Sequence, residues 1–324
     1  MERLALAILA AACVCGCADE ASTGLPEDPA DDGALSFEVT TDEIVVDDGL
    51  ITDTTVPLTC YVPEGAGPYP VVVFNHGFSM TPDMYASYGE HLASWGYVAI
   101  LPEMPGSAID PVDHDVLAGY LGMVLDWIDA VAGDPDGPLR GVADPARLGV
   151  SGHSLGGKIS LLLCAEDDRP IASFAVDPVD SCGVLSGGCT SVTPELMPQI
   201  DIPLGLLGET TNAEGDLLDP PCAPADDNFR RYYSAASSPA IRIELLGASH
   251  MSFLDDPDCG VLCSVCPDGT DDPAVTLRLT QRYLTAFYNV FLKGDEAYRG
   301  YLTGQGMAAD VGAGLVETAA KNGF

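Results

Sequence analysis

The sequence has few basic residues, and this scarcity argues against one broad class of function. It contains 13 Lys and Arg against 49 Asp and Glu, and none of the 13 lies between Arg3 and Arg140. The resulting net charge of −36 repels phosphate backbones and anionic lipid headgroups. We therefore expect no nucleic-acid partner, and we interpret the acidic surface as a means of staying solvated.

Long apolar runs are also scarce. The run from Leu4 to about Val14 follows Arg3 and is too short to span a membrane, so it predicts a signal peptide over residues 1–17. Residues 14–17 resemble a bacterial lipobox in which Cys17 carries the lipid, and residues 10–13 are a weaker match. We thus expect an exported protein, lipid-anchored to the cell envelope or otherwise periplasmic or secreted. No other segment is expected to cross a membrane.

The rest of the chain divides into a spacer and one domain. Residues 18–36 hold Asp, Glu, Pro and small residues without a basic side chain, a composition typical of a flexible acidic spacer. Residues 37–324 contain short apolar runs, such as 71–74, that alternate with helical patterns, such as 112–131. This alternation predicts an α/β domain with a mostly parallel central sheet flanked by helices.

Cysteine is the next feature that bears on the fold. The chain has 11, three of them in the predicted leader, and eight remain for pairing if Cys17 carries the lipid, an even number that predicts disulfides after export. Cys182 and Cys189 flank a Gly-rich loop and are close enough in sequence to pair. A zinc site is an alternative for the cluster 259–266, but no histidine accompanies it, so we expect no metal. Cys164 lies in an apolar helix and is expected to be a buried free thiol.

Residues 152–157 form a G-x-S-x-G motif between an apolar strand and a helix, the context of a nucleophile elbow in an α/β-hydrolase fold. Ser154 is the predicted nucleophile, and the backbone N–H of Leu155 is expected to face a developing oxyanion. A second N–H donor is expected from the loop after strand 71–74, where Phe78 is our choice. His76 in that loop is expected to brace it and not to act as a base.

The chain has five histidines, so few residues could serve as the base that activates Ser154. Only His250 follows Ser154, and the order in such hydrolases is Ser, acid, His, so His250 is the predicted base. His114 is expected at the surface. The acid is left open by the residues alone, because several carboxylates follow predicted strands. The candidates are Asp177, Asp180, Glu209, Asp216 and Asp219.

The chain from about Pro57 to Tyr301 resembles the chlorophyllase family. The matching pieces are residues 69–78, 152–158, 176–180, 208–209, 220–224, 250–251, 254–256 and 263–269. The resemblance implies an ester hydrolase with a Ser-Asp-His triad and no cofactor, whose acid is the Asp of an Asp-Pro-Val piece, here Asp177. Two departures are visible: Leu155 stands where the family usually has Arg, and residues 263–266 read Cys-Ser-Val-Cys instead of a shorter Cys-x-Cys.

These observations predict a carboxylic ester hydrolase that works through an acyl-enzyme on a small or lipophilic ester. Polyester and cutin hydrolases share the His-Gly-aromatic loop and the elbow, so a polyester-, cutin- or lipid-type esterase is an alternative. A second alternative, from another class, is a non-catalytic surface lipoprotein that kept the fold as a binding module. The intact Ser154, Asp177 and His250 favour the enzyme.

Overall fold

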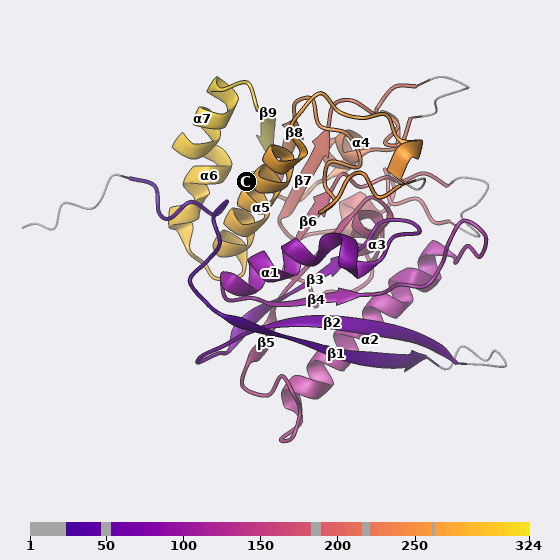
Figure 1. Ribbon diagram of the computed structural model, residues 1–324, viewed down its shortest axis with the longest axis vertical. Helices are drawn as coiled ribbons and strands as arrows, with labels where there is room; N and C mark the ends of the chain where they lie inside the picture. Colours follow the sequence, from indigo (N-terminus) through magenta and orange to yellow (C-terminus); the bar gives the residue numbers. More distant parts are fainter. Residues whose placement is uncertain (1–23, 47–52, 183–188, 216–220, 261–262) are drawn as a thin grey trace, which may run out of the picture.

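The computed structural model describes residues 24–46, 53–182, 189–215, 221–260 and 263–324, and the predicted signal peptide lies outside them. The described residues form one nine-stranded sheet with helices on both faces (Figure 1). The strands are β1 (Phe37–Val46), β2 (Thr54–Pro63), β3 (Tyr69–Asn75), β4 (Val98–Pro102), β5 (Ala143–His153), β6 (Ala172–Val176), β7 (Leu204–Glu209), β8 (Ala240–Leu245) and β9 (Val316–Lys321). The α-helices are α1 (Ala86–Ser94), α2 (His114–Gly133), α3 (Leu155–Cys164), α4 (Phe229–Ala235), α5 (Pro273–Phe291), α6 (Arg299–Thr303) and α7 (Gln305–Gly312).

The strand order in the sheet is β1-β2-β4-β3-β5-β6-β7-β8-β9. Every neighbouring pair from β4 to β8 is parallel. The antiparallel pairs β1–β2, β2–β4 and β8–β9 lie toward the two edges. Parallel neighbours need crossover connections, which most of the helices supply. This mostly parallel sheet between helices confirms the predicted α/β-hydrolase fold.

Two hydrophobic cores cover the sheet, one on each face. In β3, Val72 and Phe74 pack into the core beneath α1 and α5, whereas Val71 and Val73 pack into the core beneath α2 and α3. The alternation follows from the two-residue period of a strand, and burial of both faces explains why residues 71–74 are continuously apolar. The central strands are thereby fixed from both sides.

Helix α2 corrects the expectation that no later segment has the length to cross a membrane. Its 20 residues are long and apolar enough for a span by length and composition. In the structure, however, Leu117, Leu121, Val124 and Leu125 are buried in the core against the sheet. Its apolarity is therefore accounted for by packing in the domain.

The N-terminal segment differs in part from the expected spacer over residues 18–36. Arg282 of α5 forms a bidentate ion pair with Asp28: Nε donates to Oδ1 at 2.9 Å and Nη2 donates to Oδ2 at 2.6 Å. Trp95 Nε1 donates to the Asp31 carbonyl oxygen at 2.9 Å, and Ala30 is buried. Scarce arginines thus pair with the acidic segment, and residues 28–31 lie against the domain.

Candidate active site

Four of the loops that follow parallel strands carry the predicted functional residues. Phe78 follows β3, Ser154 follows β5, Asp177 follows β6 and His250 follows β8. Because the carboxyl ends of parallel strands meet at one edge of a sheet, residues up to 172 positions apart in sequence gather there. This edge is the candidate active site.

The turn at Ser154 has the sharp geometry expected of an elbow. Ser154 has φ 55° and ψ −119°, a conformation that residues with a side chain rarely adopt. A Cβ atom on Gly152 would lie 2.5 Å from the carbonyl carbon of Gly156, and one on Gly156 would overlap the carbonyl oxygen of Asn75. Only glycine fits at these two positions, so strand β5 and helix α3 approach closely with Ser154 between them.

A chain of two hydrogen bonds joins the three predicted side chains. Ser154 Oγ lies 2.9 Å from His250 Nε2, and His250 Nδ1 lies 2.6 Å from Asp177 Oδ2. Asp177 and His250 are buried, whereas Ser154 is partly accessible. The Asp177 backbone N–H donates to the Leu207 carbonyl oxygen at 2.7 Å, which ties the carboxylate to strand β7. A serine, an imidazole and a carboxylate so arranged can move a proton away from the serine hydroxyl.

His153 packs its ring against His250, with 4.6 Å between the ring centroids. Complete burial, together with the neighbouring His250, holds the pKa of His153 well below its ordinary value. Its Nδ1 is 2.7 Å from the hydroxyl of the buried Tyr85. His153 therefore supplies an uncharged, fixed surface beside the His250 ring.

The loop after β3 is braced by His76, as predicted. Met104 N–H donates to His76 Nε2 at 2.9 Å, so the ring proton lies on Nδ1, which donates to the Gly77 carbonyl oxygen at 2.8 Å. Burial lowers the pKa of His76, and the neutral form fits this pattern. The bracing holds the backbone next to Phe78 in place.

A pocket beside Ser154 is lined by Phe78 and Leu155 together with Met104, Val112 and Ile159. Neither the Phe78 nor the Leu155 backbone N–H donates to another described residue. Two unpaired amides that share a mostly apolar pocket are suited to bind the oxygen of a polarised carbonyl group.

Of the acid candidates that the structure describes, only Asp177 contacts His250. Glu209 is buried at the end of β7 and accepts from the Thr211 and Asn212 backbone N–H groups. Burial and the charge of Asp177 raise the pKa of Glu209 to about 8. Asp216 and Asp219 lie outside the described residues.

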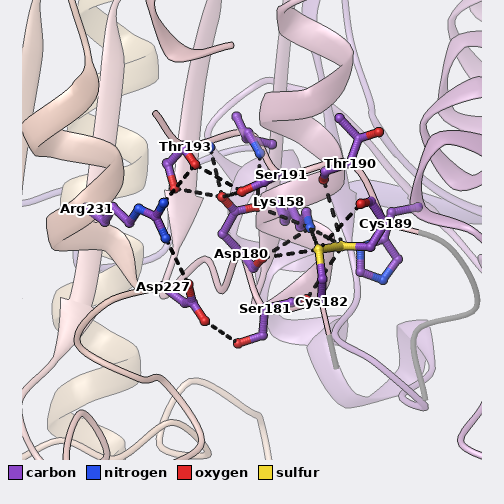
Figure 2. Close-up of polar contacts among 12 residues, drawn as sticks. Lys158, Asp180, Ser181, Cys182, Cys189, Thr190, Ser191, Thr193, Asp227 and Arg231 are labelled. Carbon is purple, nitrogen blue, oxygen red and sulfur yellow. Dashed lines mark hydrogen bonds and ion pairs between the residues drawn. A yellow bond between two sulfur atoms is a disulfide. The ribbon is translucent and has the colours of Figure 1, made fainter. Parts of the chain in front are cut away.

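Asp180, a further acid candidate, forms a buried ion pair with Lys158 of α3 (Figure 2). Lys158 Nζ is 3.1 Å from Asp180 Oδ1, and both side chains are fully buried. Burial lowers the pKa of Lys158, and Asp180 partly offsets this. Burial alone would raise the pKa of Asp180, but hydrogen bonds from Ser191 and Thr193 and the charge of Lys158 leave it below its ordinary value. The pair joins the helix after Ser154 to the segment after Asp177.

The Cys182–Cys189 disulfide, predicted from its spacing, lies beside this ion pair (Figure 2). Lys158 Nζ is 2.8 Å from Cys189 Sγ. His114, which we expected at the surface, is buried with its Nδ1 3.2 Å from the same sulfur. The expectation for His114 is wrong because α2 turns its first residue inward, against the sulfur of Cys189.

The other cysteines that the structure describes give two more disulfides, Cys222–Cys266 and Cys259–Cys263, and two buried free thiols, Cys60 and Cys164. The free thiol predicted at Cys164 is confirmed. The three cysteines of the cluster 259–266 all belong to disulfides, so none of them offers a thiolate to zinc. The one set of potential metal ligands among the described residues is His153, Asp177 and His250, whose ligand atoms lie within 4.8 Å of one another. The Nδ1 atoms of both histidines are already hydrogen-bonded.

Two site-supporting residues were missed from the sequence. Lys158 is the only charged residue in helix α3, and a lone Lys among apolar residues is a signal for a buried ion pair. Asn212 accepts a hydrogen bond from the His250 backbone N–H at 2.7 Å. Nothing in the sequence distinguishes this asparagine from those of ordinary loops.

Comparison with known proteins identifies the family of the chain. The family model described as chlorophyllase matches residues 33–309. Chlorophyllase-1 of Arabidopsis thaliana is 28% identical over 79% of this chain and 83% of its own length. Chlorophyllase-2 of the same plant is 26% identical over 72% of this chain and 77% of its own. Cutinase est2 of Thermobifida alba is 25% identical over 75% of this chain and 67% of its own.

The family match covers 277 residues (33 to 309 inclusive) of the 324 in the chain, and it includes β2 to β8, the elbow and the loop of His250. The relatives are chlorophyllases and cutinases, both of which are carboxylesterases. The resemblance seen in the sequence pieces is therefore confirmed, and the chain belongs to the chlorophyllase family.

Proposed function

We propose that the protein hydrolyses carboxylic esters through a covalent acyl-enzyme. The observation that carries the proposal is the hydrogen-bonded chain from Ser154 through His250 to Asp177, at the edge of the sheet where substrates reach α/β proteins. Membership of a family of carboxylesterases supports it.

In the proposed mechanism Ser154 Oγ attacks the ester carbonyl carbon while His250 Nε2 takes the hydroxyl proton. Asp177 stabilises the imidazolium, and the Phe78 and Leu155 N–H groups hold the oxyanion. His250 then gives the proton to the departing alcohol, which leaves an acyl ester on Ser154. Water, deprotonated by His250, releases the acid and restores the enzyme. No step requires a cofactor.

The substrate class that we propose is a neutral, lipophilic ester of the kind cleaved by chlorophyllases. The pocket beside the two amides is mostly apolar, and a net charge of −36 disfavours anionic substrates. The cutinase relatives make a polyester- or cutin-type substrate the second candidate.

A panel of esters tests both candidates: chlorophyll, p-nitrophenyl esters of short and long acyl chains, and a polyester film. Ser154→Ala is the control, and its kcat should be lower by about 10⁶-fold. Chlorophyll hydrolysis without release of acid from the film supports the first candidate, and the reverse supports the second. If the protein hydrolyses no ester of the panel and a fluorophosphonate probe does not label its serine, the result supports the non-catalytic binding module.

We further propose that the protein is exported and anchored by lipid at Cys17. The support is the N-terminal sequence pattern. Cys17→Ser should release the protein from the membrane fraction of the cells that make it. Unchanged fractionation of this variant would remove the anchor.

A further inference from the structure

The imidazole of His250 has to hold two hydrogen bonds at once, one to Asp177 and one to Ser154. Its position depends on a loop between β8 and α5 that has no regular secondary structure of its own around residue 250. The His250 backbone N–H donates to Asn212 Oδ1 at 2.7 Å. Asn212 lies in a different loop, the one that follows β7.

Asn212 is fully buried, and all of its polar groups are used. Its backbone N–H donates to Glu209 Oε2 at 2.7 Å, and its carbonyl oxygen accepts from the Ala223 N–H at 3.1 Å. Its side-chain Nδ2 donates to the Pro267 carbonyl oxygen at 3.0 Å. The residue is thus fixed before its one remaining acceptor meets His250.

The partners of Asn212 come from rigid parts of the structure. Glu209 ends a central strand. Ala223 and Pro267 each stand next to a half-cystine of the Cys222–Cys266 disulfide, which joins the loop after β7 to the segment before α5. Through these hydrogen bonds, Asn212 holds the backbone of His250 at a fixed distance from the end of strand β7 and from this disulfide.

From these contacts we propose that Asn212 is a positioning residue for the ester hydrolysis proposed above: it fixes the backbone of His250 so that the imidazole stays between Asp177 and Ser154. The inference rests on that proposed function. An asparagine suits this position because its side chain presents an acceptor to one loop and a donor to another.

The test compares two buried asparagines. Asn212→Ala removes the acceptor for His250 N–H, and a misplacement of the imidazole by about 1 Å lowers catalysis by roughly 10²-fold. We expect kcat on a p-nitrophenyl ester to fall by about that factor, with KM within about threefold of wild type. The rate of labelling by a fluorophosphonate should fall in parallel, because the probe also needs the base.

Asn228→Ala is the matched control. Asn228 is also fully buried, its Nδ2 donates to the Ala223 carbonyl oxygen at 3.0 Å, and its Oδ1 accepts from the Arg230 N–H at 3.1 Å. It does not contact His250. We expect the melting temperature of both alanine variants to fall and kcat of the Asn228 variant to stay near wild type. An equal loss of kcat in the two variants would overturn the inference, as would an unchanged kcat in Asn212→Ala.

Asn212→Asp covers the case in which the alanine variant does not fold. It keeps an acceptor for His250 N–H and loses the bond to Pro267, so it should retain about a tenth or more of kcat. A folded Asn212→Asp enzyme without activity would contradict the inference. Ser154→Ala separates the two proposals: if it still hydrolyses the ester, the proposed function fails, whereas an inactive Ser154→Ala beside a fully active Asn212→Ala refutes only the role of Asn212.

Discussion

Asp177→Asn examines the acid of the proposed triad, which the sequence alone left among five carboxylates. Asp177 Oδ2 accepts from His250 Nδ1 at 2.6 Å, and this bond places the remaining lone pair on Nε2, opposite Ser154. An asparagine amide can donate to Nδ1 instead, which moves the ring proton to Nε2. His250 in that tautomer cannot take the proton of Ser154.

The expected loss in kcat is about 10⁴-fold, which corresponds to roughly 5.4 kcal/mol of transition-state stabilisation. The fold should persist, because the Asp177 backbone bond to Leu207 does not involve the side chain. Steady-state hydrolysis of a p-nitrophenyl ester gives kcat, and circular dichroism checks the fold. Glu209→Gln is the control and should keep most of the activity. If Asp177→Asn keeps its activity while Glu209→Gln loses it, Glu209 at the end of β7 is the triad acid and the assignment of Asp177 is wrong.

Three further predictions concern stability and redox state. Lys158→Met should lower the free energy of unfolding by about 3–5 kcal/mol in chemical denaturation, because it leaves Asp180 charged and buried; a change below about 1 kcal/mol would contradict the buried pair. Folding raises the pKa of Glu209 from 4.5 to about 8, so the folded state binds more protons within this range and its stability falls as pH rises through it. The free energy of unfolding of Glu209→Gln, measured against that of wild type, should therefore be higher at pH 9 than at pH 5. The same difference between variant and wild type at both pH values would refute the raised pKa. Titration of denatured, unreduced protein that begins at residue 18 should find two thiols, Cys60 and Cys164, and six or more would exclude the disulfides.

The elbow and the central strands could be predicted because their signals are local. Residues 71–74 are continuously apolar since both faces of β3 are buried, and glycines stand at 152 and 156 since no side chain fits there. The chain order of the fold then predicts His250 as the base, whereas Asp177 was implied only by the family resemblance. In the structure these side chains form one hydrogen-bonded chain with Ser154.

The parts that sequence reasoning missed depend on contacts between distant segments. Strand β9 is an edge strand in which three of six residues are exposed, and its Val-Glu-Thr-Ala-Ala-Lys sequence lacks a strong apolar alternation. His114 is buried against the sulfur of Cys189, 75 positions away. Asp28 lies against the domain because Arg282, 254 positions away, pairs with its carboxylate. No local pattern encodes such pairings.

Labelling with a fluorophosphonate tests the central claim, that Ser154 is an activated nucleophile, most directly. The probe reacts only with a serine whose proton a neighbouring base removes. Mass spectrometry of the labelled, folded protein should find one adduct, on the peptide that contains Ser154, and none in Ser154→Ala. A folded wild-type protein that takes up no label, or takes it up on another residue, would contradict the account.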